Sequence, residues 1–240
     1  HVDIHFVTGG TQANVTVISH SLRPWEGVLC AVTGHINGHE TGATEARGHK
    51  VLPLPEKDAK ITAEQVEAYM KKYRAMDYPE HEIAPKMIYL SQPTEQGTLY
   101  SKAELEAFRR VCDAYDLLLF IDGARLGYAL ATPENDVTLP DLARLTDVFY
   151  IGGTKVGAMF GEAIVITNDT IKPQFRYSIK QNEGMLAKGR FLGLQFDTLF
   201  TDHLYTTIAK HAIALAKKMH DEMTSYGISF FSSSPTNQIF

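Results

Sequence analysis

Two charged side chains follow strongly apolar runs, at positions where a buried strand would end. Asp122 comes directly after Leu117–Ile121, and Lys155 follows Val148–Ile151 behind two glycines and a threonine. A carboxylate there needs a cation or hydrogen-bond donors to offset its desolvation, and a protonated ring nitrogen would serve. A partly desolvated amine has a lowered pKa and can act as a nucleophile. The simpler alternatives are a helix cap or an ion pair with Arg125 for the aspartate, and a solvated side chain for the lysine.

His35 lies just beyond a third apolar run, Gly27–Val32. Its imidazole could stack on a flat ligand ring or transfer protons near neutral pH, and the alternative is an ordinary loop histidine. With His39 and Glu40 it also suggests a metal site, because two histidines four residues apart can bind zinc when they share one helix face. The glycines in this segment disfavour such a helix, so a metal-dependent hydrolase is the lower alternative.

The segment from Thr8 to Asn14 reads Thr-Gly-Gly-Thr-Gln-Ala-Asn. Glycines let the backbone approach an anion closely, and the start of a following helix presents unpaired amides and the positive end of the helix dipole. Gly10 and Thr11 could therefore bind a phosphate group. The alternative is a tight turn in which Thr11 caps the helix. The chain contains neither the dinucleotide-binding nor the P-loop glycine pattern.

The apolar segments alternate between strand-like and helix-like patterns without repeats or linkers, which is typical of an α/β fold. Several strand candidates are continuous apolar runs, which favours a mainly parallel sheet with helices on both faces. The expected strands are Gly27–Val32, Val51–Leu54, Met87–Leu90, Leu117–Ile121, Val148–Ile151 and Ala163–Thr167, and another could begin at Ile228–Phe231. The expected helices are Thr11–Leu22, Thr62–Lys72 capped by Thr62, Ser101–Tyr115 with a capping box to Glu104, Leu139–Leu145 and a long stretch Ala187–Tyr226.

In sheets of this kind ligands bind beyond the carboxyl ends of the strands. The polar segments that follow the strands should therefore meet at one edge of the sheet. Besides Asp122 and Lys155, these segments include Ser91–Gly97, which contains Glu95.

Composition excludes several classes of partner. The 240 residues carry a net charge of −5 with acidic and basic side chains interspersed, so no footprint for nucleic acid or an anionic membrane is visible. No apolar run approaches the roughly 18 residues needed to span a bilayer, and no secretory leader opens the chain. Cys30 and Cys112 lack metal or redox spacing and indicate buried thiols in a reducing compartment. We expect a cytoplasmic protein that lacks natural segments at both ends, before His1 and after Phe240.

Taken in chain order, the glycine turn, His35, Asp122-Gly-Ala-Arg125 and Gly-Gly-Thr-Lys155 resemble the threonine aldolase and β-eliminating lyase family of pyridoxal-phosphate enzymes. The resemblance covers nearly the whole chain. It implies the three-layer, aminotransferase-like architecture of fold type I, with a large cofactor-binding domain over residues 1–190. Residues 191–240 would form a long helix leading into an incomplete small C-terminal domain. Active sites in this fold commonly form between subunits, which implies a homodimer or homotetramer.

The resemblance also implies how the cofactor ring is held. Lys155 would form the Schiff base with pyridoxal 5′-phosphate. Asp122 would keep the pyridinium nitrogen protonated, so that the ring can accept electrons. His35 would stack on the ring face.

The remaining implied roles concern the phosphate and the substrate. Gly10 and Thr11 would receive the phosphate, Thr154 would add a hydroxyl, and Arg190 would reach the phosphate region. Arg125 would bind the substrate α-carboxylate as a planar, two-pronged donor.

Two features depart from the usual family pattern. Many threonine aldolases carry a histidine beside the substrate hydroxyl, where this chain has Glu95, and their lysine-bearing turn is often Ser-Lys-Gly rather than Thr154-Lys155-Val156-Gly157. A carboxylate can still act as a base, so we expect cleavage of the Cα–Cβ bond of a β-hydroxy amino acid such as threonine to glycine and an aldehyde. The alternative is β-elimination, in which Lys155 takes the Cα proton and ammonia and a keto acid are released. A non-catalytic relative is disfavoured because Lys155 and Asp122 are both present.

Overall fold

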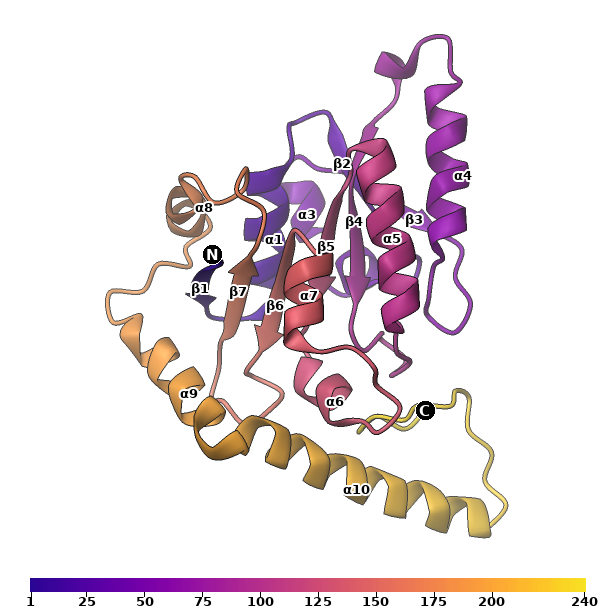
Figure 1. The fold of residues 1–240 in the computed structure, drawn as a ribbon, viewed down its shortest axis with the longest axis vertical. Helices are drawn as coiled ribbons and strands as arrows, with labels where there is room; N and C mark the ends of the chain where they lie inside the picture. The colour runs from indigo at the N-terminus through magenta and orange to yellow at the C-terminus, as the bar shows by residue number, and fades with distance from the viewer.

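The computed structural model describes residues 1–240, which form a seven-stranded sheet in the order β1-β7-β6-β5-β4-β2-β3 (Figure 1). The strands are β1 (Asp3–Val7), β2 (Glu26–Ala31), β3 (Val51–Leu54), β4 (Ala84–Ser91), β5 (Leu118–Asp122), β6 (Val148–Gly152) and β7 (Glu162–Ile166). Strands β3, β2, β4, β5 and β6 run parallel to one another, whereas β7 pairs antiparallel with both β6 and β1. The mainly parallel sheet predicted from the sequence is confirmed. Its one antiparallel strand is β7, which lies next to the edge strand β1.

Helices cover both faces of the sheet, so the molecule has three layers (Figure 1). The helices are α1 (Gly10–Ser21), α2 (His35–Gly38), α3 (Ala43–Ala46), α4 (Ala63–Arg74), α5 (Lys102–Tyr115), α6 (Leu126–Ala131), α7 (Leu139–Leu145), α8 (Phe175–Gln181), α9 (Arg190–Phe200) and α10 (Leu204–Ser225), with short 3-10 turns at Pro79–His81 and Thr201–His203. One apolar core lies between the sheet and α1 and α8, and a larger one lies between the opposite face and α4, α5, α6, α7, α9 and α10.

The central strand β5 shows why the buried strands read as continuous apolar runs. Leu119 and Ile121 belong to the larger core, whereas Phe120 between them belongs to the core under α1 and α8, and all three side chains are fully buried. Successive side chains of a strand point to opposite faces, and both faces are covered here. The carboxyl end of β5 therefore projects Asp122 from a rigid, fully packed element.

Capping boxes fix where several helices begin. The Ser101 hydroxyl accepts the backbone N–H of Glu104, whose carboxylate accepts the N–H of Ser101 in return. Thr62 caps α4 in the same way with Gln65. Each box satisfies backbone donors that a helix start leaves free. The caps predicted at Ser101 and Thr62 are confirmed.

Two predicted elements differ in the structure. The long helix expected over Ala187–Tyr226 is interrupted at Asp202 and His203, whose φ angles of 50° and 59° lie in the left-handed region. These residues separate α9 from α10 without a glycine or proline to signal the break. The strand expected to begin at Ile228–Phe231 is absent, and this segment has no regular secondary structure.

The C-terminal part of the chain packs back onto the sheet domain. α9 begins at Arg190, and α10 packs along α6. The division into residues 1–190 and 191–240 stays a prediction. Cys30 and Cys112 are both buried and unpaired. None of the helices is both long and apolar enough to cross a lipid bilayer.

Candidate active site

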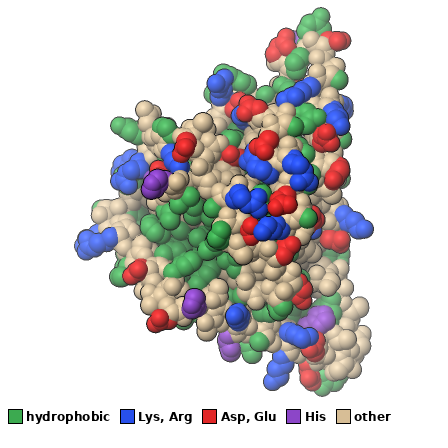
Figure 2. Space-filling model, viewed as in Figure 1, with side chains coloured by type: hydrophobic (Ala, Val, Ile, Leu, Met, Phe, Trp, Pro, Cys, Tyr) green, Lys and Arg blue, Asp and Glu red, His purple; other side chains and the backbone are tan.

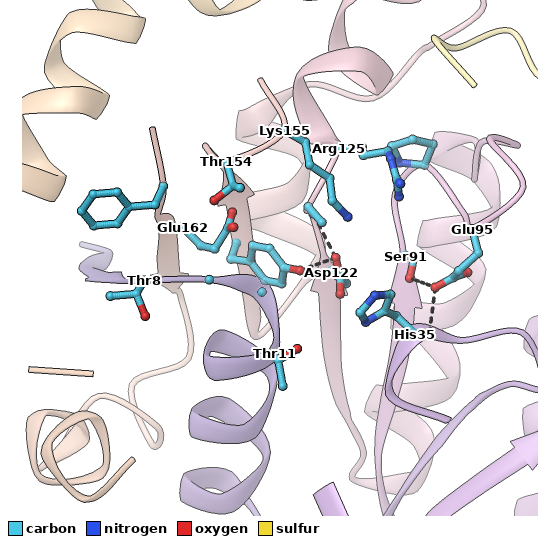
Figure 3. Close-up of a pocket in the computed structure, with 16 residues that line it drawn as sticks. Thr8, Thr11, His35, Ser91, Glu95, Asp122, Arg125, Thr154, Lys155 and Glu162 are labelled. Atoms are coloured by element: carbon cyan, nitrogen blue, oxygen red, sulfur yellow. Dashed lines mark hydrogen bonds between the residues drawn. The ribbon is translucent and has the colours of Figure 1, made fainter. Parts of the chain in front are cut away.

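A cavity of about 220 Å³ opens at the carboxyl ends of β4, β5 and β6, beside the first turn of α1 (Figure 3). This is where the sequence places the polar segments, because parallel strands deliver their carboxyl ends to one edge. The cavity is lined by Thr8, Gly9, Gly10, Thr11, His35, Ser91, Pro93, Glu95, Asp122, Ala124, Arg125, Tyr150, Thr154, Lys155, Phe160 and Glu162. All the predicted site residues except Arg190 therefore share this one space.

Asp122 lies at the floor of the cavity and is only 4% exposed. The hydroxyls of Tyr89 and Tyr150 both donate hydrogen bonds to its carboxylate. The backbone N–H of Ala124 donates a third at 2.9 Å, and the Asn14 amide donates a fourth at 3.1 Å. These donors offset the desolvation of a buried carboxylate. The Asp122–Arg125 ion pair considered from the sequence is absent from the structure.

The imidazole of His35 faces the cavity from the start of α2 and is tied to Asp122 through two buried side chains (Figure 3). His35 Nδ1 lies 2.7 Å from Oε1 of Glu40, and the same oxygen accepts a hydrogen bond from Asn14 Nδ2 at 2.7 Å. Asn14 Nδ2 also donates to Asp122, so one amide joins the two carboxylates. The hydrogen bond with Glu40 raises the pKa of His35, although burial acts in the opposite direction.

The metal-site interpretation of this segment finds no support in the geometry. His39 lies on the exposed side of the turn, whereas Glu40 is buried and bound to His35. Nowhere in residues 1–240 do three or more histidine, cysteine or acidic side chains come together in a way that could hold a metal ion.

Glu95 lies in the loop after β4, on the far side of His35 from the glycine turn (Figure 3). Its Oε1 accepts hydrogen bonds from the Ser91 hydroxyl at 2.6 Å and from the backbone N–H of His35 at 2.9 Å. Burial raises the pKa of Glu95, and the charge of Asp122 acts in the same direction, while the Ser91 hydrogen bond lowers it. Glu95 is thus a carboxylate held in one orientation and made more basic than a solvated glutamate.

Lys155 and Arg125 project into the cavity from neighbouring segments (Figure 3). Desolvation lowers the pKa of Lys155, and the Arg125 guanidinium lowers it further, whereas Asp122 acts in the opposite direction. Neither cation has an ion pair or a side-chain hydrogen bond within the chain. Two unpaired cations in a shared cavity favour an anionic ligand and leave the amine free to react.

The turn that carries Lys155 is fixed by surrounding hydrogen bonds. The Tyr128 hydroxyl donates to the carbonyl of Lys155 at 2.6 Å. Three residues before Lys155, the carbonyl of Gly152 accepts a hydrogen bond from the Tyr205 hydroxyl of α10 at 2.7 Å. The Thr154 hydroxyl accepts the backbone N–H of Gly161 at 2.9 Å, which closes the turn. The reactive amine therefore sits on a defined backbone.

The glycine turn places the start of α1 against the cavity. Gly9 is the residue before the helix, α1 begins at Gly10, and no side chain caps it. Thr11 therefore lies inside the helix and does not cap it, contrary to the alternative considered from the sequence. A Cβ atom at Gly10 would meet the Tyr150 hydroxyl at 3.1 Å, so any larger residue here would have to displace a hydroxyl that donates to Asp122. The free amides at this helix start face the cavity and could bind a phosphate.

Arg190 does not reach this cavity. It is the first residue of α9 and lines a separate surface hollow that it shares with Phe160. Its contact with a phosphate group stays a prediction.

Sequence reasoning did not single out three residues that line or support the site. Asn14 stood in the glycine motif, but only the fold shows that it joins Glu40 to Asp122. Tyr150 lies within the expected strand Val148–Ile151, and Glu162 directly precedes the expected strand Ala163–Thr167. A tyrosine or glutamate at the end of a buried strand that borders a polar cluster is the signal that could have found them.

The sequence model of the beta-eliminating lyase family matches residues 2–233. This chain belongs to the beta-eliminating lyase family. A low specificity L-threonine aldolase from a Pseudomonas species is 32% identical over 88% of the chain, which covers 60% of that relative. The solved structure of Leishmania major threonine aldolase is 46% identical and superposes with a TM-score of 0.96 over the whole chain, which covers 69% of that structure.

More distant structures confirm the fold of this family member. A Thermus thermophilus aspartate aminotransferase superposes with a TM-score of 0.69 at 18% identity, over 96% of the chain and 62% of that structure. At this identity the likeness concerns the architecture alone, and it confirms the predicted aminotransferase-like, three-layer fold.

Proposed function

We propose that this protein is a pyridoxal 5′-phosphate-dependent lyase that cleaves the Cα–Cβ bond of a β-hydroxy amino acid such as threonine, giving glycine and an aldehyde. The observation that carries this proposal is that Lys155, Asp122 and Arg125 line one cavity beside a glycine turn at a helix start. The threonine aldolases among its relatives support the same reaction.

The side chains present fit this cofactor. Lys155 offers an unpaired amine of lowered pKa for the aldehyde, and Asp122 offers a buried carboxylate for the ring nitrogen. His35 stands at the side of the cavity where it could cover the ring face, and the amides at Gly10 and Thr11, with the Thr154 hydroxyl, would hold the phosphate. When bound, the cofactor withdraws electrons from the substrate Cα and so weakens the bonds to that atom.

The chain's own residues would orient the substrate and move the protons. Arg125 has no partner in the chain, so its guanidinium is free to bind the substrate α-carboxylate through two parallel hydrogen bonds. Glu95 would accept the proton of the β-hydroxyl as the Cα–Cβ bond breaks and the aldehyde forms. Lys155 would supply the proton that Cα gains in glycine, which balances the proton taken from the hydroxyl.

The second candidate function is β-elimination at the same site. It is favoured by the lowered pKa of Lys155, because a lower pKa leaves more of the amine uncharged, and an uncharged amine can remove a proton from Cα. A leaving group at Cβ would then depart, and ammonia and a keto acid would be released after hydrolysis. The fixed position of Glu95 beside Ser91 and His35 favours aldol cleavage, since a base for the β-hydroxyl has no role in abstracting the Cα proton.

Chemical trapping tests the cofactor. Purified protein should be yellow, and borohydride reduction should leave the cofactor mass on the peptide that contains Lys155. Lys155→Ala should remove both the trapped mass and turnover while leaving the far-ultraviolet circular dichroism unchanged. A colourless protein that gains no mass after incubation with pyridoxal 5′-phosphate and reduction would overturn the proposal.

Product analysis tests the reaction. The chain covers 60% of the Pseudomonas aldolase and 69% of the Leishmania structure, so the assay uses the longest natural form of the protein. Threonine, allo-threonine, serine and aromatic amino acids are offered separately. Glycine with an aldehyde from threonine supports aldol cleavage, and ammonia with a keto acid supports the alternative.

We also propose that the protein works as a homo-oligomer. Apolar side chains stand exposed along α9, among them Phe191, Leu194 and Phe200, at 42%, 59% and 45%. Figure 2 shows apolar side chains gathered in the hollow between α7 and α9. Exposed apolar surface of this kind supports burial against another protein surface. Light scattering after size exclusion should give the mass of a dimer or tetramer, and a monomer would contradict the proposal.

A further inference from the structure

Glu162 is a buried acidic residue in the cavity to which the lyase mechanism gives no task. It begins β7, directly opposite Gly152 of β6 and Val7 of β1, and it is only 3% exposed. Its Oε2 accepts the backbone N–H of Gly153 at 3.0 Å. The residue still borders the cavity, beside Thr154 (Figure 3). A buried carboxyl group with room for a ligand next to it needs a physical explanation.

The neighbourhood of Glu162 is the end of the cavity that suits a phosphate. Val7 of β1 pairs with Glu162, and the chain continues from Val7 into the glycine turn that starts α1. Thr154 lies on the other side of the carboxyl group (Figure 3). An ionised carboxylate here would repel a doubly charged phosphate, whereas a neutral carboxyl group could donate a hydrogen bond to it.

We propose that Glu162 is a phosphate-binding residue that acts as a neutral carboxylic acid, donating its O–H to the phosphate group of the ligand held by the glycine turn and Thr154. This inference rests on the proposed function, because it takes pyridoxal 5′-phosphate as that ligand. It makes the binding of the phosphate depend on a proton carried by the protein.

Burial is the main cause that favours the neutral form of Glu162. Burial raises the pKa of Glu162 to about 7, and the charge of Asp122 on β5 acts in the same direction. Hydrogen bonds from Thr154 and from the Gly153 N–H lower the pKa, as does the cation of Lys155. The other ionisable groups near Glu162 are the hydroxyls of Tyr150 on β6 and Tyr205 on α10. On the neighbouring strand β1, the residue paired with Glu162 is the apolar Val7. A bound dianion would raise the pKa further.

The test measures affinity for pyridoxamine 5′-phosphate, which has the phosphate but no aldehyde and so leaves Lys155 unmodified. Between about pH 7 and about pH 9 the phosphate is fully ionised, and wild-type affinity should fall by up to tenfold per pH unit relative to Glu162→Gln. The amide of glutamine keeps an acceptor for the Gly153 N–H but does not titrate. Pyridoxamine, which lacks the phosphate, should bind both proteins with the same pH dependence.

Glu80→Gln is the control, because it removes an exposed carboxylate that does not line the cavity. This variant should keep the wild-type loss of affinity for pyridoxamine 5′-phosphate at high pH. Parallel curves for wild type and Glu162→Gln would overturn the role of Glu162, as would a uniform loss of affinity in the variant. Failure of the wild type to bind pyridoxamine 5′-phosphate at any pH would instead overturn the proposed cofactor.

Calorimetry on the wild type keeps the proposal testable if Glu162→Gln does not fold. Binding is measured at about pH 8 in two buffers of different ionisation enthalpy, which gives the number of protons taken up. Pyridoxamine 5′-phosphate should take up close to one proton more than pyridoxamine does. Equal proton uptake by the two ligands would overturn the proposal.

Discussion

The carboxylate of Glu95 accepts the backbone N–H of His35 at 2.9 Å, although the two residues are 60 positions apart in the chain. This contact joins the loop after β4 to the turn after β2. It holds the proposed base beside the imidazole that would cover the cofactor ring. The position of Glu95 is therefore set by the fold, not by its own loop alone.

Glu95→Gln should lower kcat for threonine by about 10²–10⁴-fold, because an amide cannot accept the hydroxyl proton. In the wild type, activity should fall toward acid pH as Glu95 becomes protonated. Because burial raises the pKa of Glu95, this fall should begin above the ordinary range of a glutamate. The pH profile of kcat/KM measures it.

Ser91→Ala is the matched variant for this fall of activity toward acid pH, the acid limb of the pH profile. The Ser91 hydroxyl lowers the pKa of Glu95, so its removal should move the limb to higher pH while keeping the base. An acid limb that stays in place in Ser91→Ala and persists in Glu95→Gln would assign the titration to another group.

Arg125→Lys should raise KM for amino acid substrates by about 10–100-fold, because a lysine loses the bidentate contact with a carboxylate, worth about 1.5–3 kcal/mol. Arg144→Lys serves as the control, since Arg144 is a half-exposed side chain at the end of α7 that pairs with Glu106. Unchanged KM in the Arg125 variant, measured by steady-state kinetics, would argue against carboxylate binding there.

Glu40→Gln should lower the pKa of His35, because the hydrogen bond with Glu40 is the main cause that raises it. The change is read from the His35 ring signals in an NMR pH titration of the protein without ligand. The ring signals of His211 and His220 on α10 serve as internal controls. If the His35 titration curve is the same in both proteins, the buried pair does not control the charge of this ring.

The sequence predicts the strands of the site well because their surroundings are uniform. β2, β4, β5 and β6 are covered on both faces, so each reads as an apolar run, and the polar residue after each run marks the cavity. β1 escaped this reasoning because it is an edge strand in which polar residues alternate with apolar ones. The break at Asp202 and His203 left little signal, because aspartate and histidine adopt the left-handed conformation more often than most residues but, unlike glycine and proline, do not mark a helix end.

The parts of the site that the sequence could not predict depend on contacts between distant segments. The resemblance assigns Arg190 to the phosphate region, yet in the structure Arg190 begins α9 and lines a separate hollow. Glu162 sits in the pattern Glu-Ala-Ile-Val-Ile, where every residue is buried, and only the pairing of β7 with β6 brings its carboxyl to the turn that carries Lys155.

Tyr205→Phe should lower the free energy of unfolding by about 1–3 kcal/mol. The Tyr205 hydroxyl accepts the N–H of Gly127 at 3.0 Å and donates to the carbonyl of Gly152 at 2.7 Å, so phenylalanine leaves both buried groups unpaired. Denaturant unfolding measures the change. Tyr177→Phe removes a hydroxyl from a side chain that is 78% exposed and should have no effect. Equal stability of the two variants would show that the link from α10 to the lysine turn is weak.

In the protein without ligand, the buried carboxyl group of Glu162 should also make the free energy of unfolding depend on pH. Burial raises the pKa of Glu162 from 4.5 to about 7, so between these values the folded protein holds a proton that the unfolded chain has lost. Stability falls as pH rises through this window, by up to about 3 kcal/mol for this group.

Glu162→Gln removes this titration, so its unfolding free energy relative to wild type should increase by up to about 3 kcal/mol between about pH 5 and about pH 8. Glu80→Gln changes an exposed carboxylate instead, and its difference from wild type should be the same at both pH values. Urea unfolding of the three proteins at the two pH values measures these differences. A constant difference between wild type and Glu162→Gln would mean that Glu162 is already ionised near pH 5, and that its buried oxygens are solvated better than their surroundings indicate.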